Sequence, residues 1–289
     1  MRALPQRFGR LIYVTALAVV IGVLAGLSGG SLYNLVSRQM RANDQLPSVL
    51  RGPAVQVVVS DTPGFAAFKD GTFAGFDIEL VDFLAADAKV RPVYVPSAPF
   101  DKLAMLQSGM AHLGAGVVIT EERRRLVDLV GPYLISHDGV MTRADDGRID
   151  AAADLDGKRV CAPMGTTTAA DAQSGQVRVE IKSLAACVES LLAGQVEAVA
   201  ADELSLRSIV KARPKDLKVI GDIEFGSSLR YGIALSPGHA ADCRELARAL
   251  REFILSDRWE ESFKAHFGPQ ADAARFRPDP NQLEHCPSA

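Results

Sequence analysis

The sequence predicts an α/β fold with a mostly parallel sheet that is built as two similar halves. Short apolar runs typical of buried strands alternate with segments of helical periodicity from Val55 onward. The same alternation begins again after Tyr133. Two segments, Leu106–Gly116 and Leu191–Asp202, also repeat the order helix end, glycine, strand. Together these three observations indicate two related α/β units.

The composition is that of an ordinary globular protein and argues against several functions. The chain has 289 residues, a formal net charge of −3, 48% hydrophobic residues and 23% charged residues. This length can fill two moderate cores. No basic stripe lies beyond the first residues, so we expect no nucleic-acid partner. The five histidines are scattered and no zinc-protease, P-loop or nucleophile-turn motif occurs, so we expect no catalytic residue, cofactor or metal.

The N-terminal segment, residues 1–52, predicts export. Three arginines in the first ten residues precede an uncharged run, Leu11–Val36. This run is longer than the ~7–15 apolar residues of a signal peptide and reaches the ~20 that span a bilayer. We therefore expect a membrane anchor through residues 11–36, with the arginines on the cytoplasmic side. The small residues Gly26, Ser28 and Gly29 leave cleavage open, and in either case the chain from Asp44 onward is expected to be extracytoplasmic, in the periplasm or at the cell surface.

The first half is predicted to contain strands and helices in regular alternation, after a polar linker at residues 41–51. They are a strand at Val55–Val59, a helix at Ile78–Ala88, a strand at Val93–Val95, a helix at Lys102–Gln107 and a strand at Leu113–Ile119. A turn-rich stretch separates the first strand from the first helix. Thr120 then has the side chain of a helix N-cap, and Glu121 and Glu122 suit the first turn that follows.

The second half repeats this plan. It contains a strand in "LDGKRVCAP", a loop and helix start in "MGTTTAADA", a helix in "SLAACVESLLAG", a strand at Val196–Ala201, a strand in "LRYGIAL" and two helices between Cys243 and Gly268. Ligands of open α/β sheets bind beyond the carboxyl ends of the strands. Two halves that face each other would bring Gly116 and Asp202 to one cleft.

Arg123 is a candidate for binding a carboxylate. Three consecutive arginines begin at this residue, although a helix N-terminus is already positive. A guanidinium and the free N–H groups of a helix start can bind the same anion, and Arg binds a planar carboxylate through two hydrogen bonds. The alternative is a solvated turn in which the arginines pair with neighbouring acids. For Arg124 and Arg125 we prefer that alternative.

Two aspartates and a glycine-threonine loop are further candidates. Asp202 ends a predicted strand and could bind an ammonium group, but it could equally cap the helix "ELSLRSIV". Asp61 also follows a strand, and a turn before Pro63 is the preferred reading there. The segment Gly165–Thr168 offers hydroxyl and N–H groups before a helix, which is a weak indication of anion binding.

The chain from about Val55 to Gly268 resembles bacterial extracytoplasmic amino-acid-binding proteins, the substrate receptors of polar amino-acid ABC importers. The resemblance rests on the order and spacing of "GFDIEL", "LQSG", "ITEERRRLVDLVGPY", "DLDGKRVC", "GTTT", "GQVEAVAAD", "YGIAL" and "WEESFKAHFG". The motif "VGPYL", together with Cys161 and Cys187, resembles the glutamate-binding branch of these receptors.

The resemblance implies the two-lobed periplasmic-binding-protein fold of type II. In this fold each lobe is a central, mostly parallel sheet flanked by helices, and two hinge crossovers join the lobes. We expect lobe 1 at residues 53–137 plus 229–268, lobe 2 at 138–228 and a tail at 269–289. The crossovers are expected near 138–142 and 225–230.

The resemblance also implies roles for the candidate site residues. Arg123 corresponds to the arginine that holds the ligand α-carboxylate, and Asp202 to the aspartate that takes the α-ammonium, helped by the carbonyl of Gly116. The segment that closes over the carboxylate from lobe 2 corresponds to Thr166, Thr167 and Thr168. Val118 stands where relatives usually carry Thr or Ser, so one hydroxyl is missing. Pro163 and Met164 stand at positions that are often polar.

The binding of the ligand side chain is open between two alignments. One places Lys102 where glutamate receptors carry a side-chain-binding arginine, which favours an acidic ligand. The other makes Phe100 a stacking aromatic and leaves the ligand charge open. An exposed helix lysine is the more common fate of a residue such as Lys102.

Four cysteines in an exported chain predict disulfides, and three connectivities are possible. The resemblance implies Cys161–Cys187 and Cys243–Cys286.

We therefore expect an extracytoplasmic receptor for glutamate, aspartate or their amides that docks on an ABC permease and catalyses nothing. A membrane-anchored sensor for a signalling partner is one alternative. A dehydratase of cyclic prephenate-like acids on the same fold is another.

Overall fold

A computed structural model describes residues 47–174, 178–269, 271–284 and 286. The predicted anchor or signal peptide at residues 11–36 lies outside this part of the chain. Within the part that is described, no helix is long and apolar enough to cross a membrane. The unit that contains the described residues extends from 47 to 288.

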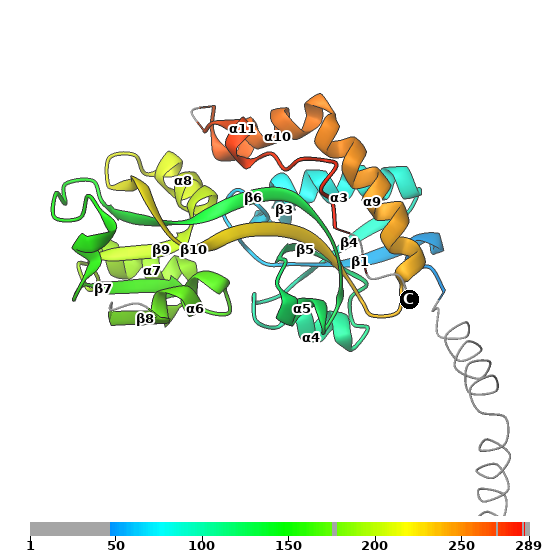
Figure 1. Cartoon of the computed structure of the whole chain (residues 1–289), viewed down its shortest axis with the longest axis horizontal. Coiled ribbons are helices and arrows are strands. Elements are labelled where there is room, and N and C mark those ends of the chain that lie inside the picture. The colour runs from blue at the N-terminus through cyan, green and yellow to red at the C-terminus, as the bar shows by residue number, and fades with distance from the viewer. Residues whose placement is uncertain (1–46, 175–177, 270, 285, 287–289) are drawn as a thin grey trace, which may run out of the picture. The chain divides into compact units, whose positions relative to one another are not determined.

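The strands and helices follow the predicted alternation (Figure 1). The strands are β1 (Ala54–Val59), β2 (Ala67–Lys69), β3 (Thr72–Ala74), β4 (Arg91–Pro96), β5 (Leu113–Val118), β6 (Asp128–Arg143), β7 (Arg159–Pro163), β8 (Arg178–Lys182), β9 (Ala198–Asp202) and β10 (Leu217–Leu235). The helices are α3 (Phe76–Ala88), α4 (Lys102–Gln107), α5 (Glu121–Arg124), α6 (Thr167–Ser174), α7 (Leu184–Leu192), α8 (Glu203–Ala212), α9 (Ala240–Leu255), α10 (Asp257–Phe267) and α11 (Ala273–Phe276), with 3-10 turns η1 (Val49–Arg51) and η2 (Ala152–Leu155).

Eight strands form one sheet in the order β4-β1-β5-β10-β6-β9-β7-β8. We call β4, β1 and β5 the first half and β9, β7 and β8 the second half. Pairing inside each half is parallel, whereas β10 pairs antiparallel with β5, and β6 with β9. The long strands β6 and β10 lie side by side and connect the halves (Figure 1). The predicted two-lobed α/β architecture is therefore confirmed.

Burial on both faces explains why the short apolar runs form strands. Along β1, Val57 and Val59 enter the main core of the first half, while Val58 enters a second core on the opposite face. Along β9, alternate residues such as Val199 and Ala200 likewise enter different cores. Successive side chains of a strand point to opposite faces, so a strand covered on both sides must be apolar throughout.

The internal repeat seen in the sequence has a structural counterpart. Helix α4 is followed by Gly109 and β5, and α7 is followed by Gly194 and β9. Both glycines adopt left-handed backbone conformations, with φ of 72° and 70°. A residue in this conformation commonly ends a helix, and glycine adopts it without steric cost. The same turn chemistry therefore redirects the chain into a buried strand in each half.

Four features differ from the sequence-based expectations. The helix after Thr120 is a single turn, because the chain enters strand β6 at Asp128. The length of β6 was not predicted, and neither were the β2–β3 hairpin and strand β8. The reason is that β6 and β10 are held by pairing with each other along most of their length, which depends on contacts distant in sequence.

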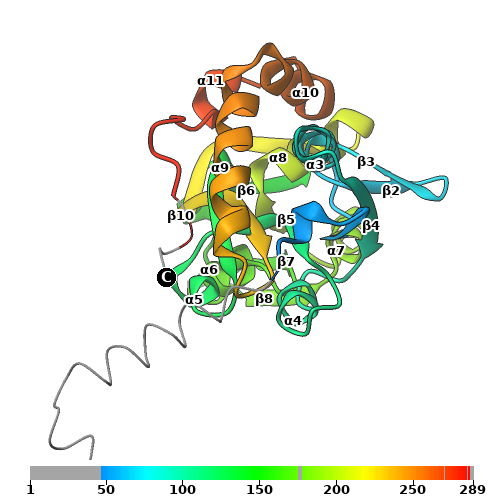
Figure 2. The same ribbon diagram turned by 90° about the vertical axis from the view of Figure 1, so that its right-hand side faces the viewer.

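An aromatic core supports the first half. Helices α3, α9 and α10 pack against one another, as Figure 2 shows. Phe76 of α3 makes edge-on ring contacts with Trp259 and Phe263 of α10, whose own rings stack on each other, and with Phe253 of α9. The indole of Trp259 donates a hydrogen bond of 2.8 Å to the carbonyl of Tyr133. This core thus fixes the backbone of β6 near the site described below.

Two disulfides join Cys161 with Cys187 and Cys243 with Cys286, the pairs that the family resemblance implied. The first ties β7 to α7, and the second ties the tail to α9.

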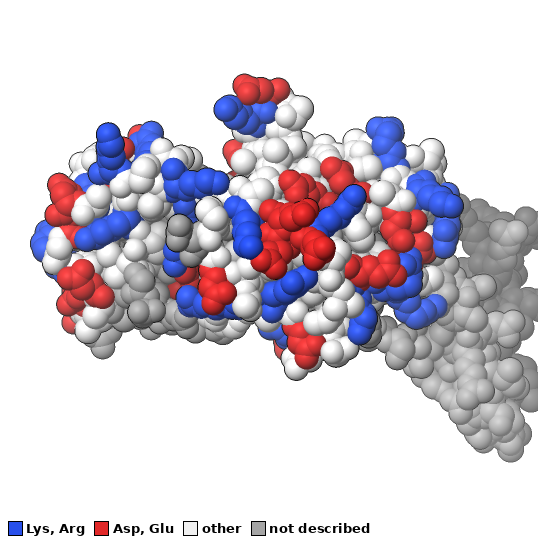
Figure 3. All heavy atoms as spheres, turned by 90° about the horizontal axis from the view of Figure 1, so that it is seen from above, with Lys and Arg blue, Asp and Glu red and all other residues white. Residues whose placement is uncertain are grey.

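On the face seen from above in Figure 3, acidic and basic side chains are mixed.

Candidate ligand-binding site

A cavity of about 510 Å³ lies between elements of the two halves. Its volume is within the range of about 300–1,000 Å³ that is typical of small-molecule sites. Residues at or directly after the carboxyl ends of β1, β5 and β9 line the cavity, as expected for an open α/β sheet. All ten residues predicted as ligand-binding line it: Asp61, Phe100, Lys102, Gly116, Val118, Arg123, Thr166, Thr167, Thr168 and Asp202.

Arg123 reaches the cavity from the single-turn helix α5. The side chain of Thr120 caps this turn by accepting a hydrogen bond of 3.2 Å from the N–H of Arg123. The guanidinium is half-buried and donates one hydrogen bond, 3.0 Å from Nη1 to the carbonyl of Val118. Burial lowers the pKa of Arg123, but a guanidinium remains charged at neutral pH. No ion pair with another described residue neutralises it.

The next arginine has a different environment, which corrects the sequence-based expectation for it. Arg124 was expected to pair with acids nearby in the sequence. Its guanidinium instead pairs with Glu284 of the tail, which also pairs with Arg230 of β10. Because the tail is held against β6 through a bridge between Gly131 and Glu284, this partner could not be found from local spacing. Arg125 is exposed.

Asp202 lies at the end of β9 and combines both roles considered for it. One carboxylate oxygen, Oδ1, accepts a hydrogen bond of 2.9 Å from the N–H of Ser205 and so caps α8. The other, Oδ2, is buried without a hydrogen-bond partner among the described residues. Burial raises the pKa of Asp202 to about 6, against the lowering effects of nearby hydroxyls and of the Ser205 N–H. Among the described residues, therefore, no cation pairs with this desolvated carboxylate.

The N-terminus of α6 borders the cavity from the second half. Thr166 caps this helix: its hydroxyl accepts a hydrogen bond of 3.2 Å from the N–H of Ala169 and donates one of 2.7 Å to the carbonyl of Pro163. Thr168 is buried and its hydroxyl donates to Asp138. The hydroxyls of both threonines are thus engaged within the protein. Among the described residues, the hydroxyl of Thr167 and the N–H groups of Thr167 and Thr168 are donors left at this edge of the cavity, because the N–H of Ala169 already donates to Thr166.

Lys102 is buried, which removes the alternative of an exposed helix lysine. Only 7% of the residue is exposed, and Nζ donates a hydrogen bond of 2.6 Å to the carbonyl of Ala115. Burial lowers the pKa of Lys102 to about 8, while the charge of Asp77 acts in the opposite direction. Its helix, α4, packs on β1 and β5, which carries the side chain into the cavity wall.

Asp77 is a buried, charged wall residue that the sequence-based reasoning did not select. It lies in the first turn of α3, is 3% exposed, and Oδ1 accepts a hydrogen bond of 2.6 Å from the hydroxyl of Tyr133. That hydroxyl in turn accepts from the N–H of Gly116 at 3.0 Å. Burial raises the pKa of Asp77 to about 6. An acid in a first helical turn is ordinary helix chemistry, so only its burial marks Asp77 as unusual.

Apolar side chains form another part of the wall. Phe100 and Met164 are largely exposed yet line the cavity from opposite halves. The backbone of Phe100 lies so close to Gly165 that a Cβ there would fall 3.0 Å from the Phe100 nitrogen. Of Phe65, Phe68, Phe73 and Phe76, which follow the first strand, only Phe65 lines the cavity. The structure therefore brings both Phe100 and Lys102 to the wall and does not choose between the two alignments.

Asp61 lies at the edge of the cavity and is exposed. Its Oδ1 accepts a hydrogen bond of 3.0 Å from the N–H of Phe68 in the hairpin. A turn follows Asp61 directly, closed by the hydrogen bond of 3.1 Å from the N–H of Phe65 to the carbonyl of Thr62, and the Asp61 side chain adds a contact to β2.

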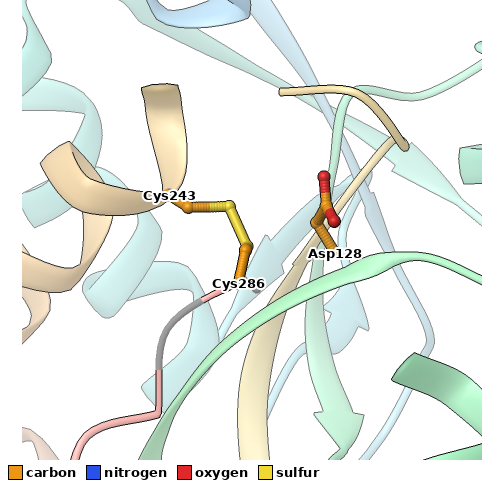
Figure 4. Close-up of side chains that lie close together, drawn as sticks. All are labelled: Asp128, Cys243 and Cys286. Carbon is orange, nitrogen blue, oxygen red and sulfur yellow. A yellow bond between two sulfur atoms is a disulfide. The ribbon is translucent and has the colours of Figure 1, made fainter. Parts of the chain in front are cut away.

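One cluster of metal-ligating residue types occurs among the described residues, at Asp128, Cys243 and Cys286 (Figure 4). Its ligand atoms lie within 4.8 Å of one another. The two sulfurs, however, are joined in a disulfide, so no thiolate is present to bind a metal.

Comparison with known proteins gives a consistent assignment. A family model of bacterial extracellular solute-binding proteins, family 3, matches residues 55–269. The glutamate-binding protein GluB of Corynebacterium efficiens is 27% identical in an alignment that covers 93% of this chain and 95% of the relative. The L-cystine-binding protein TcyJ of Escherichia coli K12 is 27% identical over 66% of this chain and 75% of the relative.

Solved structures agree with this result. An ancestral arginine-binding protein bound to glutamine has a TM-score of 0.69 and 26% identity, covering 75% of this chain and 99% of that one. A solute receptor for L-cysteine of Neisseria gonorrhoeae has a TM-score of 0.72, and at 20% identity over 80% of this chain and 98% of that one it shows the fold alone. The chain belongs to the bacterial extracellular solute-binding proteins of family 3 and has their two-lobed periplasmic-binding-protein fold.

Proposed function

We propose that the protein is an extracytoplasmic receptor that binds a free α-amino acid of the group glutamate, aspartate, glutamine and asparagine, and delivers it to an ABC permease. The observation that carries the proposal is the placement of Arg123 and Asp202. A cation without an ionic partner and a buried carboxylate oxygen without a hydrogen-bond partner, among the described residues, line one cavity from different halves of the sheet.

This arrangement suits the two charged ends of a zwitterion. The α-carboxylate would bind Arg123 and the N–H groups at the start of α6, since charge-assisted hydrogen bonds to guanidinium and helix N-termini favour anions. The α-ammonium would bind Oδ2 of Asp202 and the carbonyl of Gly116. A cation there would offset the cost of burying the carboxylate.

The relatives support the ligand class. The names of the proteins compared above refer to glutamate, cystine, arginine, glutamine and cysteine, all of which are α-amino acids. These ligands share the α-ammonium and α-carboxylate and differ in the side chain. The shared part is what Arg123 and Asp202 would recognise.

Family membership and the two-lobed architecture support delivery to a permease. Only a closed arrangement of the two lobes lets Arg123 and Asp202 engage one ligand from opposite sides. A ligand that binds the closed form better than the open form shifts the population towards it. The closed form would be the state that docks on the permease.

A thermal-shift screen of the twenty amino acids with the purified protein tests the proposal. A ligand that binds the native state stabilises it by RT ln(1 + [L]/Kd), so the melting temperature should rise with dose for one or a few amino acids. Calorimetry then gives the affinity. The absence of any dose-dependent shift at millimolar amino acid would contradict the proposal.

A further inference from the structure

The C-terminal tail contributes an acid that pairs with two arginines next to the cavity. From α11 the tail, red in Figure 2, runs towards α5. One carboxylate oxygen of Glu284 pairs with Arg124 of α5, and the other pairs with Arg230 of β10. The match to the family model ends at residue 269, so these two ion pairs come from a part of the chain beyond the matched domain.

The backbone around Glu284 is fixed independently of the two arginines. Its N–H donates a hydrogen bond of 2.6 Å to the carbonyl of Gly131 in β6, and its carbonyl accepts one of 3.1 Å from the N–H of Gly131. Two residues later, Cys286 is buried and joined to Cys243 of α9 by a disulfide. The carboxylate is therefore presented to the arginines from a firmly attached segment.

The single turn α5 contains no buried residue that could hold it in place. A helix of this length is too short to be stable by itself. Its local contacts are the cap from Thr120 and the hydrogen bond from Arg123 to the carbonyl of Val118. The pair between Arg124 and Glu284 fastens the turn to a segment that is distant in sequence.

Without Glu284 the two arginines would repel each other. Burial lowers the pKa of Arg124, the charge of Glu121 acts against this effect, and the charge of Arg230 adds to it. The side chain of Arg124 is only 15% exposed, so solvent and salt screen the repulsion incompletely. Loss of the acid would therefore push Arg124 away from β10.

Movement of Arg124 would be passed on to Arg123. The two residues are consecutive in one turn, where successive side chains point about 100° apart. Arg124 can thus be held by the tail while Arg123 lines the cavity. Arg230 is tied to the same segment, because its carbonyl accepts a hydrogen bond of 2.8 Å from the N–H of Ile119, directly before the cap residue Thr120.

We propose that Glu284 is a positioning residue for ligand binding: by pairing with Arg124 and Arg230 it holds α5 so that the guanidinium of Arg123 meets the ligand α-carboxylate. Hydrogen bonds between charged groups depend on distance and direction, so a small shift of this turn weakens them. The inference rests on the proposed function, because it concerns the arginine that would bind the amino acid.

Calorimetry of the purified protein with glutamate, aspartate, glutamine and asparagine tests this inference. Glu284→Gln keeps the size of the side chain and removes its charge. We expect about tenfold weaker binding of each of these amino acids that wild type binds, by similar factors, because all four share the α-carboxylate.

The direction of the change separates positioning from a simple charge effect. A negative charge that acted only through its field would oppose binding of the α-carboxylate, so its removal would strengthen binding. A residue that only stabilised the fold would leave unchanged the affinity of the folded protein. Titrations are therefore run well below the melting temperature of each unliganded variant, which is measured separately.

Arg124→Gln breaks the same ion pair from the other side and should weaken binding to a similar extent. The double variant Arg124→Gln/Glu284→Gln should bind no more weakly than either single variant, because both substitutions remove one interaction. If Glu284→Gln does not fold, Arg124→Gln decides.

Asp279→Asn is the matched control. Asp279 lies in the same tail, is exposed, and among the described residues its carboxylate accepts hydrogen bonds only from Asn281. The substitution removes one negative charge from the tail and leaves the ion pairs of Glu284 intact, so ligand affinity should equal that of wild type.

Three outcomes overturn the inference. Unchanged or tighter binding in Glu284→Gln would do so and leave the proposed receptor function standing. Additive losses in the double variant would also do so, since they would place Glu284 and Arg124 in separate interactions. Failure of wild type to bind any of the four amino acids would instead reject the proposed function, and the inference with it.

Discussion

The two walls of the cavity provide opposite charges in different ways. On the wall formed by β5 and α5, the guanidinium of Arg123 is half-buried and holds only the carbonyl of Val118 among the described residues. On the wall formed by β9 and α8, the carboxylate of Asp202 is buried and also caps a helix. The cation thus contributes little to the fold, whereas the anion has a structural role as well as the proposed one.

This difference explains why the two residues should respond differently to substitution. Removing Arg123 should affect ligand affinity with little effect on folding. Removing Asp202 should change both ligand affinity and the free energy of unfolding, since a helix cap is lost together with a costly buried charge. The neighbouring Arg124 shows the other possible fate of an arginine here, because its charge is neutralised by Glu284.

The largest expected effect is that of Arg123→Ala on binding. Loss of a charge-assisted contact to the ligand carboxylate should weaken amino-acid affinity by about 2–5 kcal/mol. Calorimetry measures the loss, and the melting temperature of the unliganded protein should change little. Arg125→Ala, which alters an exposed arginine two residues later, is the control and should bind normally. Unchanged affinity in Arg123→Ala would reject the assignment of Arg123 as the residue that binds the α-carboxylate.

The next largest effect is a pH dependence of stability that arises from Asp202 on the other wall. The pKa of Asp202 is raised from 3.8 to about 6 in the folded protein, so between these values the native state holds more proton than the unfolded state. The contribution of Asp202 to the free energy of unfolding of the unliganded protein should therefore be greatest below pH 4. It should fall by at most about 3 kcal/mol as the pH rises to 6.

Urea unfolding of wild type and Asp202→Asn at pH 4 to 7 measures this contribution as a difference between the two proteins. The asparagine variant should lose less stability than wild type as the pH rises, because it cannot ionise. Asp77, whose pKa is also raised to about 6, contributes equally to both proteins and cancels. Parallel curves for the two proteins would show that Asp202 is not the desolvated acid described here.

A smaller effect separates the two roles of Asp202. Asn is as good an N-cap as Asp, whereas Ala is a poor one, so Asp202→Ala should be about 1 kcal/mol less stable than Asp202→Asn. Both variants should lose ligand affinity to a similar extent, because both lack the charge that would bind the ammonium. Denaturant unfolding and calorimetry at pH 7 give the two quantities. Wild-type affinity in Asp202→Asn would mean that the ligand α-ammonium does not bind to Asp202.

The smallest expected effect restores a hydroxyl on the first wall. Val118→Thr is nearly isosteric and places a donor beside the carbonyl that Arg123 contacts. It should strengthen binding of the α-carboxylate by about 0.5–1.5 kcal/mol. Weaker binding on calorimetry would mean that the apolar side chain at this position packs against the ligand.

Much of the fold could be predicted from local patterns. Apolar runs such as Val57–Val59 and Val199–Ala201 indicate strands covered on both faces, and glycines such as Gly109 mark the ends of helices. The length of β6 could not be predicted in this way. It is determined by antiparallel pairing with β10, nearly a hundred residues later in the sequence, which local periodicity does not record.

The candidate site shows the same division at the level of single residues. The repeated order of helix, glycine and strand is a local pattern, and it suffices to mark Gly116 and Asp202 as candidates. Asp77 was not selected and the burial of Lys102 was left open, since an acid or a lysine on a helix has the same sequence context whether it faces solvent or a cavity. The partner of Arg124 lies 160 residues away and was missed for the same reason.

By itself the sequence determined the alternation of strands and helices, the internal repeat and the residue types that could grip a zwitterion, because these depend on periodicity and on side-chain chemistry along the chain. The tertiary structure alone decided which of those side chains share a cavity, which charges are already neutralised and which buried acid meets which buried base. Those outcomes depend on desolvation and on distances between segments far apart in the sequence, and neither quantity is defined until the chain has folded.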